Sequence, residues 1–358
     1  MICPHCAKNL LRKERPGNRC SHCGRRYALD PKTNPLGLHD LRVLRIAAGL
    51  TDEGRVRITP GQLWYALSRK RIREAKGAAG CAAGALAIGV LLTLGALIFQ
   101  VAFLLYVSGT LLASWLAILV ARRTGAVGGV PPIPRAHFRS VALVEWLQVY
   151  GSLPAGVVDD DGLALPERPK DAPAPNAVLV CPDPSIAAFL AADGLPERHG
   201  IALVRGAEQV RALLPSLPPR GPVLVLHDAD APGELLLRTL RAGHPERPVV
   251  DAGVALRTVR GLTKAVPYRD PDGKPSAEER RRLEALGEFT PEELKWLAHG
   301  WRFPLVGVPP VKLLAVVDRL AGQAARGGDA ERRRATEAGF MTWPGAAPGG
   351  TDPQDVSR

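Results

Sequence analysis

The sequence lacks the glycine-rich phosphate-binding loops found in many enzymes. Neither GxxxxGKS/T nor GxGxxG occurs in its 358 residues, which argues against nucleotide hydrolysis and dinucleotide binding. The first long apolar run begins only at Gly77, so a cleavable signal peptide is not expected. Hydrophobic residues make up 46% of the chain, which excludes wholesale disorder and leaves a core to bury.

Cysteine is scarce and unevenly placed. Four of the six cysteines lie in the first 23 residues as two close pairs, whereas Cys81 and Cys181 are solitary in apolar surroundings. This distribution is typical of a metal site and not of a disulfide framework.

The paired cysteines have the spacing of metal ligands. Each CxxC turn directs two thiolates at one point, and the 13-residue gap between the pairs suits a short hairpin that closes a tetrahedral shell. The first 30 residues or so resemble a zinc ribbon, which implies a structural zinc held by Cys3, Cys6, Cys20 and Cys23. The alternatives are a redox dithiol pair, or a shell in which His5 or His22 replaces one thiolate. Because four thiolates leave no position for water, we do not expect catalysis at this metal.

Charged residues are absent from Gly77 to Ala121. As a single helix this run of about 45 residues would be roughly 65 Å long, about twice the thickness of the hydrocarbon core. We therefore predict a transmembrane hairpin with helices over 79–98 and 102–121, and a turn at Phe99-Gln100 or at Ser108-Gly109. Basic residues on both flanks place both termini in the cytoplasm of a bacterial cell, beneath the inner membrane.

The positive charge lies almost entirely before this run. Residues 1–76 contain 17 Lys and Arg against 6 Asp and Glu, whereas residues 122–358 contain 30 against 29. Such a region attracts anionic lipid headgroups or nucleic acid, and charge alone does not choose between them. Within it, Thr59 followed by Pro60 and Gln62 predicts the start of a helix.

From Ala177 the pattern alternates between short Val/Leu runs and helical segments. Buried runs of this kind predict parallel strands covered on both faces, hence a three-layer α/β domain of generic Rossmannoid type. Ligands of such sheets bind beyond the carboxyl ends of the strands. Two polar stretches fall there, Cys181-Pro182-Asp183 and His227-Asp228-Ala229-Asp230.

The stretch DADAPG after the third strand has the form DxDxxG, and a strand, DxDxxG and a helix in series resemble the second motif of the Toprim domain. The resemblance covers roughly residues 177–254 and implies magnesium at Asp228 and Asp230. The earlier loop, which carries a glutamate in that family, reads CPDPS here, so only Asp183 could replace it. An enzyme is therefore uncertain and disfavoured.

Other interpretations of these residues stay open. Asp230 could cap the following helix while Asp228 accepts loop amides, or the pair could hold a ligand or metal without catalysis. Cys181 and His227 could form a thiolate–imidazole pair.

We predict a multi-domain membrane protein that acts as a membrane-tethered scaffold or sensor, recruiting a partner or ligand. The alternative is a membrane-anchored, magnesium-dependent Toprim-like enzyme acting on nucleic acid. The predicted parts are a zinc ribbon (1–30), a basic helical segment (31–76), the hairpin (77–121), a linker with an amphipathic helix (122–176), the α/β domain (177–254), a helical extension with capped helices (255–326) and a disordered tail (327–358).

Overall fold

The computed structural model describes residues 1–34, 36–77, 90–91, 93, 102–123, 129–161, 173–219, 221–262 and 264–328. The predicted tail therefore lies almost entirely outside the described residues. The proline-rich part of the linker, 162–172, and Cys81 also lie outside them.

A four-stranded parallel sheet positions the candidate pocket. Its strands are β1 (Val178–Val180), β2 (Ala202–Val204), β3 (Val223–Val225) and β4 (Val249–Asp251), in the order β2-β1-β3-β4. All three neighbouring pairs are parallel, as the Val/Leu runs predict. The helices between the strands are α7 (Pro184–Ala192), α8 (Leu195–His199), α9 (Ala207–Leu213) followed by η4 (Leu214–Ser216), and α10 (Ala231–Gly243).

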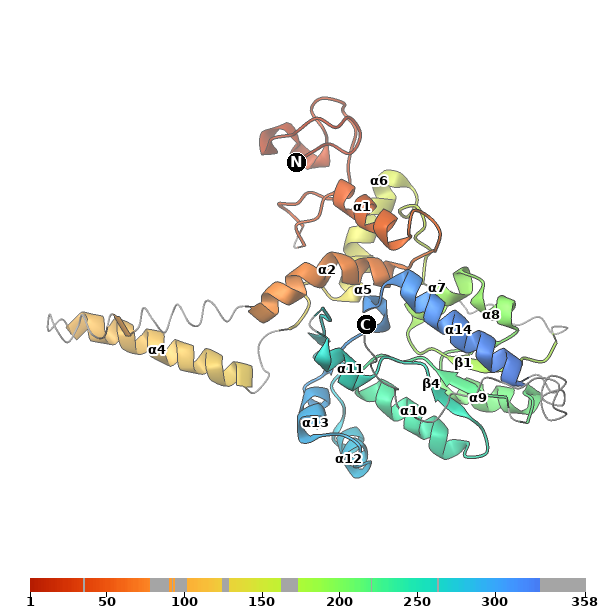
Figure 1. Ribbon diagram of the computed structural model, residues 1–358. Helices are drawn as coiled ribbons and strands as arrows, with labels where there is room; N and C mark the ends of the chain where they lie inside the picture. The colour runs from red at the N-terminus through yellow and green to blue at the C-terminus, as the bar shows by residue number, and fades with distance from the viewer. Residues whose placement is uncertain are drawn as a thin grey trace, which may run out of the picture.

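Alternate residues of each central strand enter two separate cores. Leu179 and Leu224 pack with α7 and with α14 (Pro310–Gly328), whereas Val178 and Val223 pack with α9 and α10. Figure 1 shows α14 and α10 on either side of the strands. The predicted three-layer α/β arrangement is therefore confirmed.

The N-terminal helices pack on this domain. They are α1 (Asp40–Leu50) and α2 (Pro60–Gly77), and they are joined there by α5 (Arg135–His137), the π-helical turn η3 (Phe138–Leu143) and α6 (Val144–Tyr150). Trp64 Nε1 donates to the carbonyl of Ile133 at 2.9 Å, and the Tyr65 hydroxyl donates to the carbonyl of Val266 at 2.8 Å. One continuous core thus runs from Ala28 to Ala324, with contributions from the predicted segments 31–76, 122–176, 177–254 and 255–326.

The C-terminal extension is mainly helical, as predicted, with α11 (Leu256–Gly261), α12 (Ala277–Ala285), α13 (Pro291–Ala298), the short turn η5 (Leu305–Gly307) and α14. Ser276 and Thr290 form capping boxes at the starts of α12 and α13. An antiparallel pair that was not predicted, β5 (Tyr268–Arg269) with β6 (Trp301–Arg302), places Arg302 beside the sheet. A backbone bridge between Ala229 and Phe303 fixes this placement.

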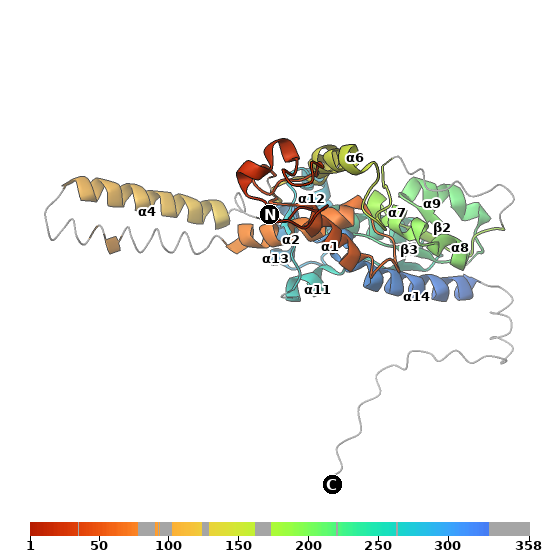
Figure 2. The ribbon, with the colours of Figure 1, turned by 90° about the horizontal axis from the view of Figure 1, so that it is seen from above.

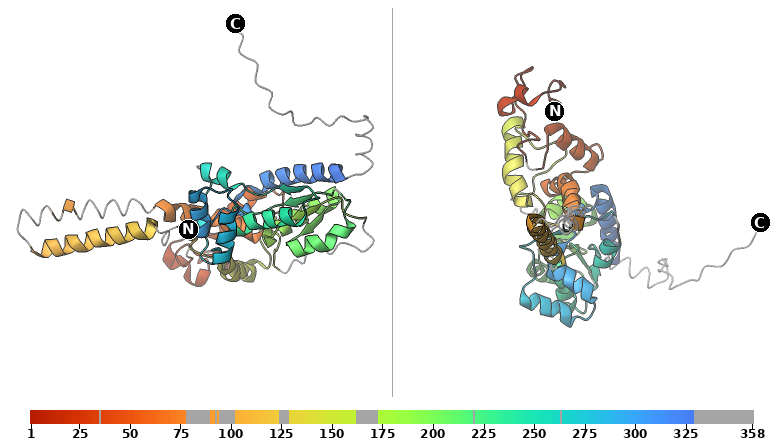
Figure 3. Two further views of the ribbon diagram at one scale, coloured as in Figure 1. Left: turned by 90° about the horizontal axis from the view of Figure 1, so that it is seen from below. Right: turned by 90° about the vertical axis from the view of Figure 1, so that its left-hand side faces the viewer.

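Among the residues that the structure describes, no helix is both long enough and apolar enough to cross a bilayer. The second predicted crossing coincides with α4 (Ala102–Arg123), which projects away from the other elements in Figures 2 and 3. The first, 79–98, lies outside the described residues except for 90, 91 and 93. The predictions of a membrane protein, of an inner-membrane location and of the membrane as partner are therefore wrong. They rested on the length of the uncharged run 77–121, which indicated two crossings; in the described part of that run the only long helix is α4.

Candidate metal centre and candidate pocket

The four N-terminal cysteines meet as predicted. Their sulfur atoms all lie within 4.8 Å of one another, so they could hold a metal ion. Cys3 Sγ is 3.8 Å from Cys23 Sγ, and Cys6 Sγ is 3.8 Å from Cys20 Sγ. Sulfur atoms at the corners of a tetrahedron with bonds of about 2.3 Å would be about 3.8 Å apart. The cluster has the dimensions of a four-thiolate shell.

The two turns that carry these cysteines are near copies of each other. The first reads CPHCAK (3–8) and the second CSHCGR (20–25). In the first, Cys3 N donates to the carbonyl of Lys8 at 2.8 Å; in the second, Cys20 N donates to the carbonyl of Arg25 at 3.0 Å. His5 Nε2 contacts the carbonyl of Arg26 at 2.7 Å, so this histidine is engaged across the two turns and is not a fifth ligand in the cluster.

The N-terminal cysteine segment is connected to the rest of the molecule through Asp40, at the start of α1. The buried carboxylate accepts the amides of Ala28 and Leu29, each at 2.8 Å, and the hydroxyl of Tyr150. Burial and the Asp40 carboxylate raise the pKa of Tyr150, which keeps its hydroxyl protonated as a donor. The cysteine cluster therefore has a fixed connection to α1 and α6.

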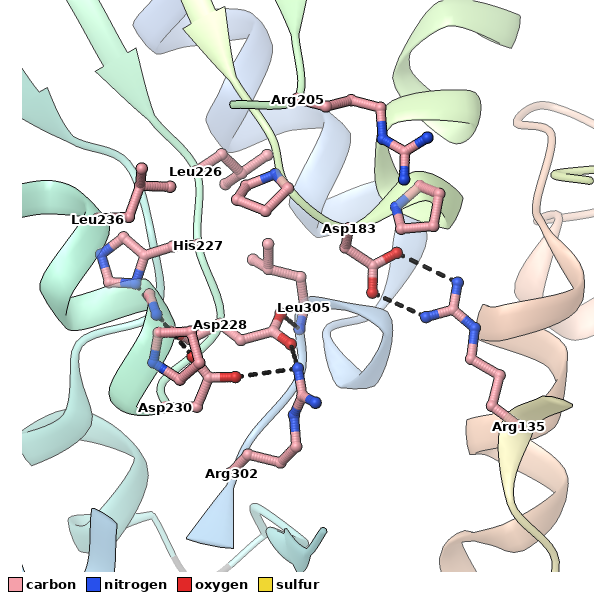
Figure 4. Close-up of a pocket in the computed structure, with 14 residues that line it drawn as sticks. Arg135, Asp183, Arg205, Leu226, His227, Asp228, Asp230, Leu236, Arg302 and Leu305 are labelled. Carbon is pink, nitrogen blue, oxygen red and sulfur yellow. Dashed lines mark hydrogen bonds and ion pairs between the residues drawn. The ribbon is translucent and has the colours of Figure 1, made fainter. Parts of the chain in front are cut away.

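The second candidate site is a pocket of about 520 Å³ at the carboxyl ends of β1 and β3 (Figure 4). Asp183, Asp228 and Asp230 all line it, together with His227 and with Arg135, Arg205 and Arg302. The three aspartates thus share one pocket, as the strand-end argument predicts. Among the described residues, however, they do not form a group whose ligand atoms all lie as close together as the cysteine sulfurs do.

Asp183 ends the loop after β1 and is fully engaged. Its carboxylate accepts the amides of Ser185 and Ile186 as the N-cap of α7, and both Arg135 guanidinium nitrogens bind it, at 2.8 and 3.2 Å. Burial alone would raise the pKa of Asp183, but the charge and hydrogen bonds of Arg135 outweigh it and hold the pKa below its ordinary value. The carboxylate stays ionised and paired.

Asp228 and Asp230 share one guanidinium. Arg302 Nη2 lies 2.5 Å from Asp228 Oδ2 and 2.9 Å from Asp230 Oδ2, and Nη1 lies 3.2 Å from Asp270. Asp228 also accepts the amide of Leu305 at 2.8 Å, and Asp230 accepts the amide of Gly233 at 2.8 Å as the N-cap of α10. The capping interpretation of Asp230 is therefore confirmed. Whether either carboxylate binds a divalent metal stays a prediction.

The surroundings of Asp228 and Asp230 favour the protonated form of each carboxyl group over the ionised form. Burial raises the pKa of Asp228 in spite of the opposing charge of Arg302. Burial and the neighbouring charge of Asp228 raise the pKa of Asp230 to about 6. Because both shifts exist with the guanidinium in place, Arg302 offsets only part of the cost of burying two adjacent carboxylates.

Cys181 and His227 have other partners. Cys181 Sγ donates to the carbonyl of Asp183 at 3.6 Å, and burial raises the pKa of its thiol well above the ordinary value. His227 Nδ1 bonds the carbonyl of Asp228 at 2.8 Å, and Nε2 lies 3.2 Å from Asp251. A protonated thiol is a poor nucleophile, so these surroundings do not favour the thiolate–imidazole interpretation.

The three pocket arginines carry no motif that marks them in the sequence. Arg135 follows a proline-rich stretch interpreted only as a linker, Arg205 follows β2, and Arg302 belongs to the two-residue strand β6. No family model, no curated protein and no solved structure matches this chain.

Proposed function

We propose that this protein is a non-catalytic scaffold or sensor, in which a zinc ribbon and an α/β pocket recruit a partner or ligand. The observation that carries the proposal is the pairing of Asp228 and Asp230 with Arg302. Magnesium-dependent chemistry needs carboxylates that face the metal, and here the guanidinium lies where both carboxylates converge (Figure 4).

Zinc is the metal that the cysteine cluster fits best. Thiolates are soft ligands, four of them in tetrahedral spacing are typical of structural zinc, and no side is left open for water. The zinc would hold together a segment whose own buried core contains little beyond Cys3, Leu10 and Cys20. Its work in this proposal is structural.

The two cysteine turns predict an opposite pair of mutational effects. Ala7 and Gly24 occupy equivalent positions with φ of 58° and 69°, a conformation that costs a residue with a Cβ about 1 kcal/mol. Ala7 is exposed, and a Cβ on Gly24 would meet no atom within 4 Å, so the backbone dominates at both positions. We expect Ala7→Gly to tighten zinc binding about fivefold and Gly24→Ala to weaken it similarly, as measured by competition with a chromophoric chelator. Shifts in the same direction in both variants would contradict this.

The pocket fits a ligand with an anionic group at its rim. Arg135 and Arg302 are paired with carboxylates, whereas the exposed Arg205 has no carboxylate partner among the described residues. Arg205 lines both this pocket and an adjoining hollow of about 470 Å³, which also shares Arg135 and Pro184. A small anion could therefore reach Arg205 without displacing an internal ion pair.

The second candidate function is a Toprim-like, magnesium-dependent enzyme acting on nucleic acid. The convergence of Asp183, Asp228 and Asp230 on one pocket favours it. It requires Arg302 to leave both aspartates and Asp183 to leave Arg135 and the cap of α7. Asp183 would also have to supply the acid-base role of the missing glutamate.

A manganese titration separates the two candidates. For the scaffold or sensor, calorimetry on the zinc-loaded chain at pH 7.5 is expected to show no saturable heat up to millimolar Mn²⁺. Saturable binding that disappears in both Asp228→Asn and Asp230→Asn would instead support the enzyme. The control is Asp318→Asn, because Asp318 is a partly exposed carboxylate outside the pocket, paired with Arg198 and His199.

A further inference from the structure

The two cysteine turns are surrounded by exposed positive charge. Four exposed basic residues, which we call the knuckle cations, lie on these turns or directly beside them: Lys8, Arg19, Arg25 and Arg26. Arg12, Lys13 and Lys32 are further exposed cations of the same small segment. None of these charged side chains belongs to the cysteine cluster or lines the pocket.

Backbone and side-chain contacts place the knuckle cations around the cysteine cluster. The carbonyls of Lys8 and Arg25 accept the amides of Cys3 and Cys20, and the carbonyl of Arg26 contacts His5 Nε2. Arg19 Nη1 donates to the carbonyl of Gly24 at 2.9 Å, which holds its guanidinium against the second turn. The backbones of Lys8, Arg25 and Arg26 and the guanidinium of Arg19 are therefore held at the two cysteine turns.

The acidic residues of the ribbon do not neutralise this charge. Asp30 is buried against Arg15, and Glu14, which accepts the amide of Leu11, offsets only one positive charge. A zinc ion with four thiolates carries a net charge of about −2, which is less than the knuckle cations supply. Exposed charges reinforce one another only within about one Debye length, about 10 Å at 0.1 M salt, so neighbouring cations of this small unit act together and their attraction for an anion weakens as the salt concentration rises.

We propose that the knuckle cations form a binding surface for the phosphate backbone of nucleic acid. Three of the four are arginines, whose planar fork matches phosphate oxygens. The exposed residues of the two turns themselves, Ala7, Ser21, His22 and Gly24, include no large aliphatic side chain that would insert into lipid; the exposed Ile2 and Leu11 lie outside the turns. The surface therefore binds phosphates without reading the sequence.

This inference gives the partner of the proposed scaffold a chemical class. Like the proposed function, the inference requires the cysteines of the ribbon to hold a metal, and it requires nothing else from that proposal. Manganese binding in the pocket would overturn the scaffold proposal and leave the oligonucleotide result unaffected, so the two can fail separately.

The test uses the full zinc-loaded chain and a fluorescein-labelled single-stranded 20-mer of mixed sequence, with binding followed by anisotropy from 50 to 300 mM salt. We expect Lys8→Gln/Arg25→Gln/Arg26→Gln to weaken binding at least tenfold at 100 mM salt. We also expect the slope of log affinity against log salt to fall by roughly 2, as the loss of three phosphate contacts predicts. A scrambled 20-mer should bind equally well.

The matched control removes the same charge elsewhere. Arg280, Arg281 and Lys312 are exposed cations of α12 and α14, and Arg280→Gln/Arg281→Gln/Lys312→Gln should retain wild-type affinity. Equal losses in both triple variants would show that only net charge matters and would overturn the proposal. So would the absence of binding by the wild-type chain, or binding to phosphatidylserine vesicles in place of the oligonucleotide. Zinc content and circular dichroism, measured on each variant, report whether it has folded.

Discussion

Removal of zinc is expected to unfold the ribbon and leave the α/β domain folded. Binding free energies of structural zinc are about 10–16 kcal/mol at neutral pH, and the buried cluster at the cysteine turns consists of Cys3, Leu10 and Cys20, with Cys6 and Cys23 packed against it. That core is separate from the large one, which begins at Ala28. The cysteine turns therefore bury too little apolar surface to stay folded once the metal is removed.

Hydrogen exchange before and after treatment with a strong chelator measures this directly. The amides of Cys3, Ala7, Cys20 and Gly24 are hydrogen-bonded within the two cysteine turns and should lose protection. The amides of Cys181 and Leu226, bonded in the parallel sheet, should keep it. Continued protection of the cysteine turns in metal-free protein would contradict the assignment. Cys181→Ser serves as a control for metal content, because this buried cysteine lies outside the cluster.

The parallel sheet could be predicted because each strand is determined by a short stretch of neighbouring residues. The runs of Val and Leu around 178–180 and 223–225 are too short for helices and too apolar for a half-exposed strand, so a sheet covered on both faces was the natural solution. Helix starts at Asp230, Ser276 and Thr290 were likewise recognisable, because a capping side chain acts within three residues of its own position. The metal cluster was predictable for the same reason, since two of its ligands occur in each short turn.

The partners of the candidate carboxylates could not be predicted, because they come from far along the chain. Arg302 is 74 residues from Asp228, on a two-residue strand with no periodicity to recognise. Arg135 lies 48 residues before Asp183 in a stretch whose prolines indicated only a linker. Arg139 likewise lies 20 residues before Asp159 and 21 before Asp160, and it pairs with both. Sequence reasoning thus found the carboxylates and missed the cations that decide what they can do.

Replacement of Arg302 by methionine is expected to destabilise the fold by roughly 3–5 kcal/mol at pH 7.5, measured by urea unfolding. Removal of one partner of a buried ion pair leaves an uncompensated charge, and here two carboxylates lose the same guanidinium. The side chains of Asp228 and Asp230 are only 6% and 10% exposed, so water replaces the lost partner poorly. Arg302→Lys should destabilise the fold less than Arg302→Met, because lysine keeps the positive charge but lacks the planar guanidinium fork.

The dependence of this loss on pH distinguishes lost charge pairing from lost packing. The pKa values of Asp228 and Asp230 already lie above the ordinary range, and loss of Arg302 raises them further. Raised carboxyl pKa values mean that the folded state binds protons more readily than the unfolded one, so the destabilisation should shrink as the pH falls from 7.5 to 5.

Asp228→Asn/Asp230→Asn should remove most of the effect of Arg302→Met. Arg55→Met, which removes the arginine from an exposed pair with Asp52, should cost less than about 1 kcal/mol. The loss of unfolding free energy in Arg302→Met could instead be equal at both pH values, or no greater than in Arg55→Met. Either result would mean that the guanidinium does not hold the two aspartates. The argument against a metal site in this pocket would then lose its basis.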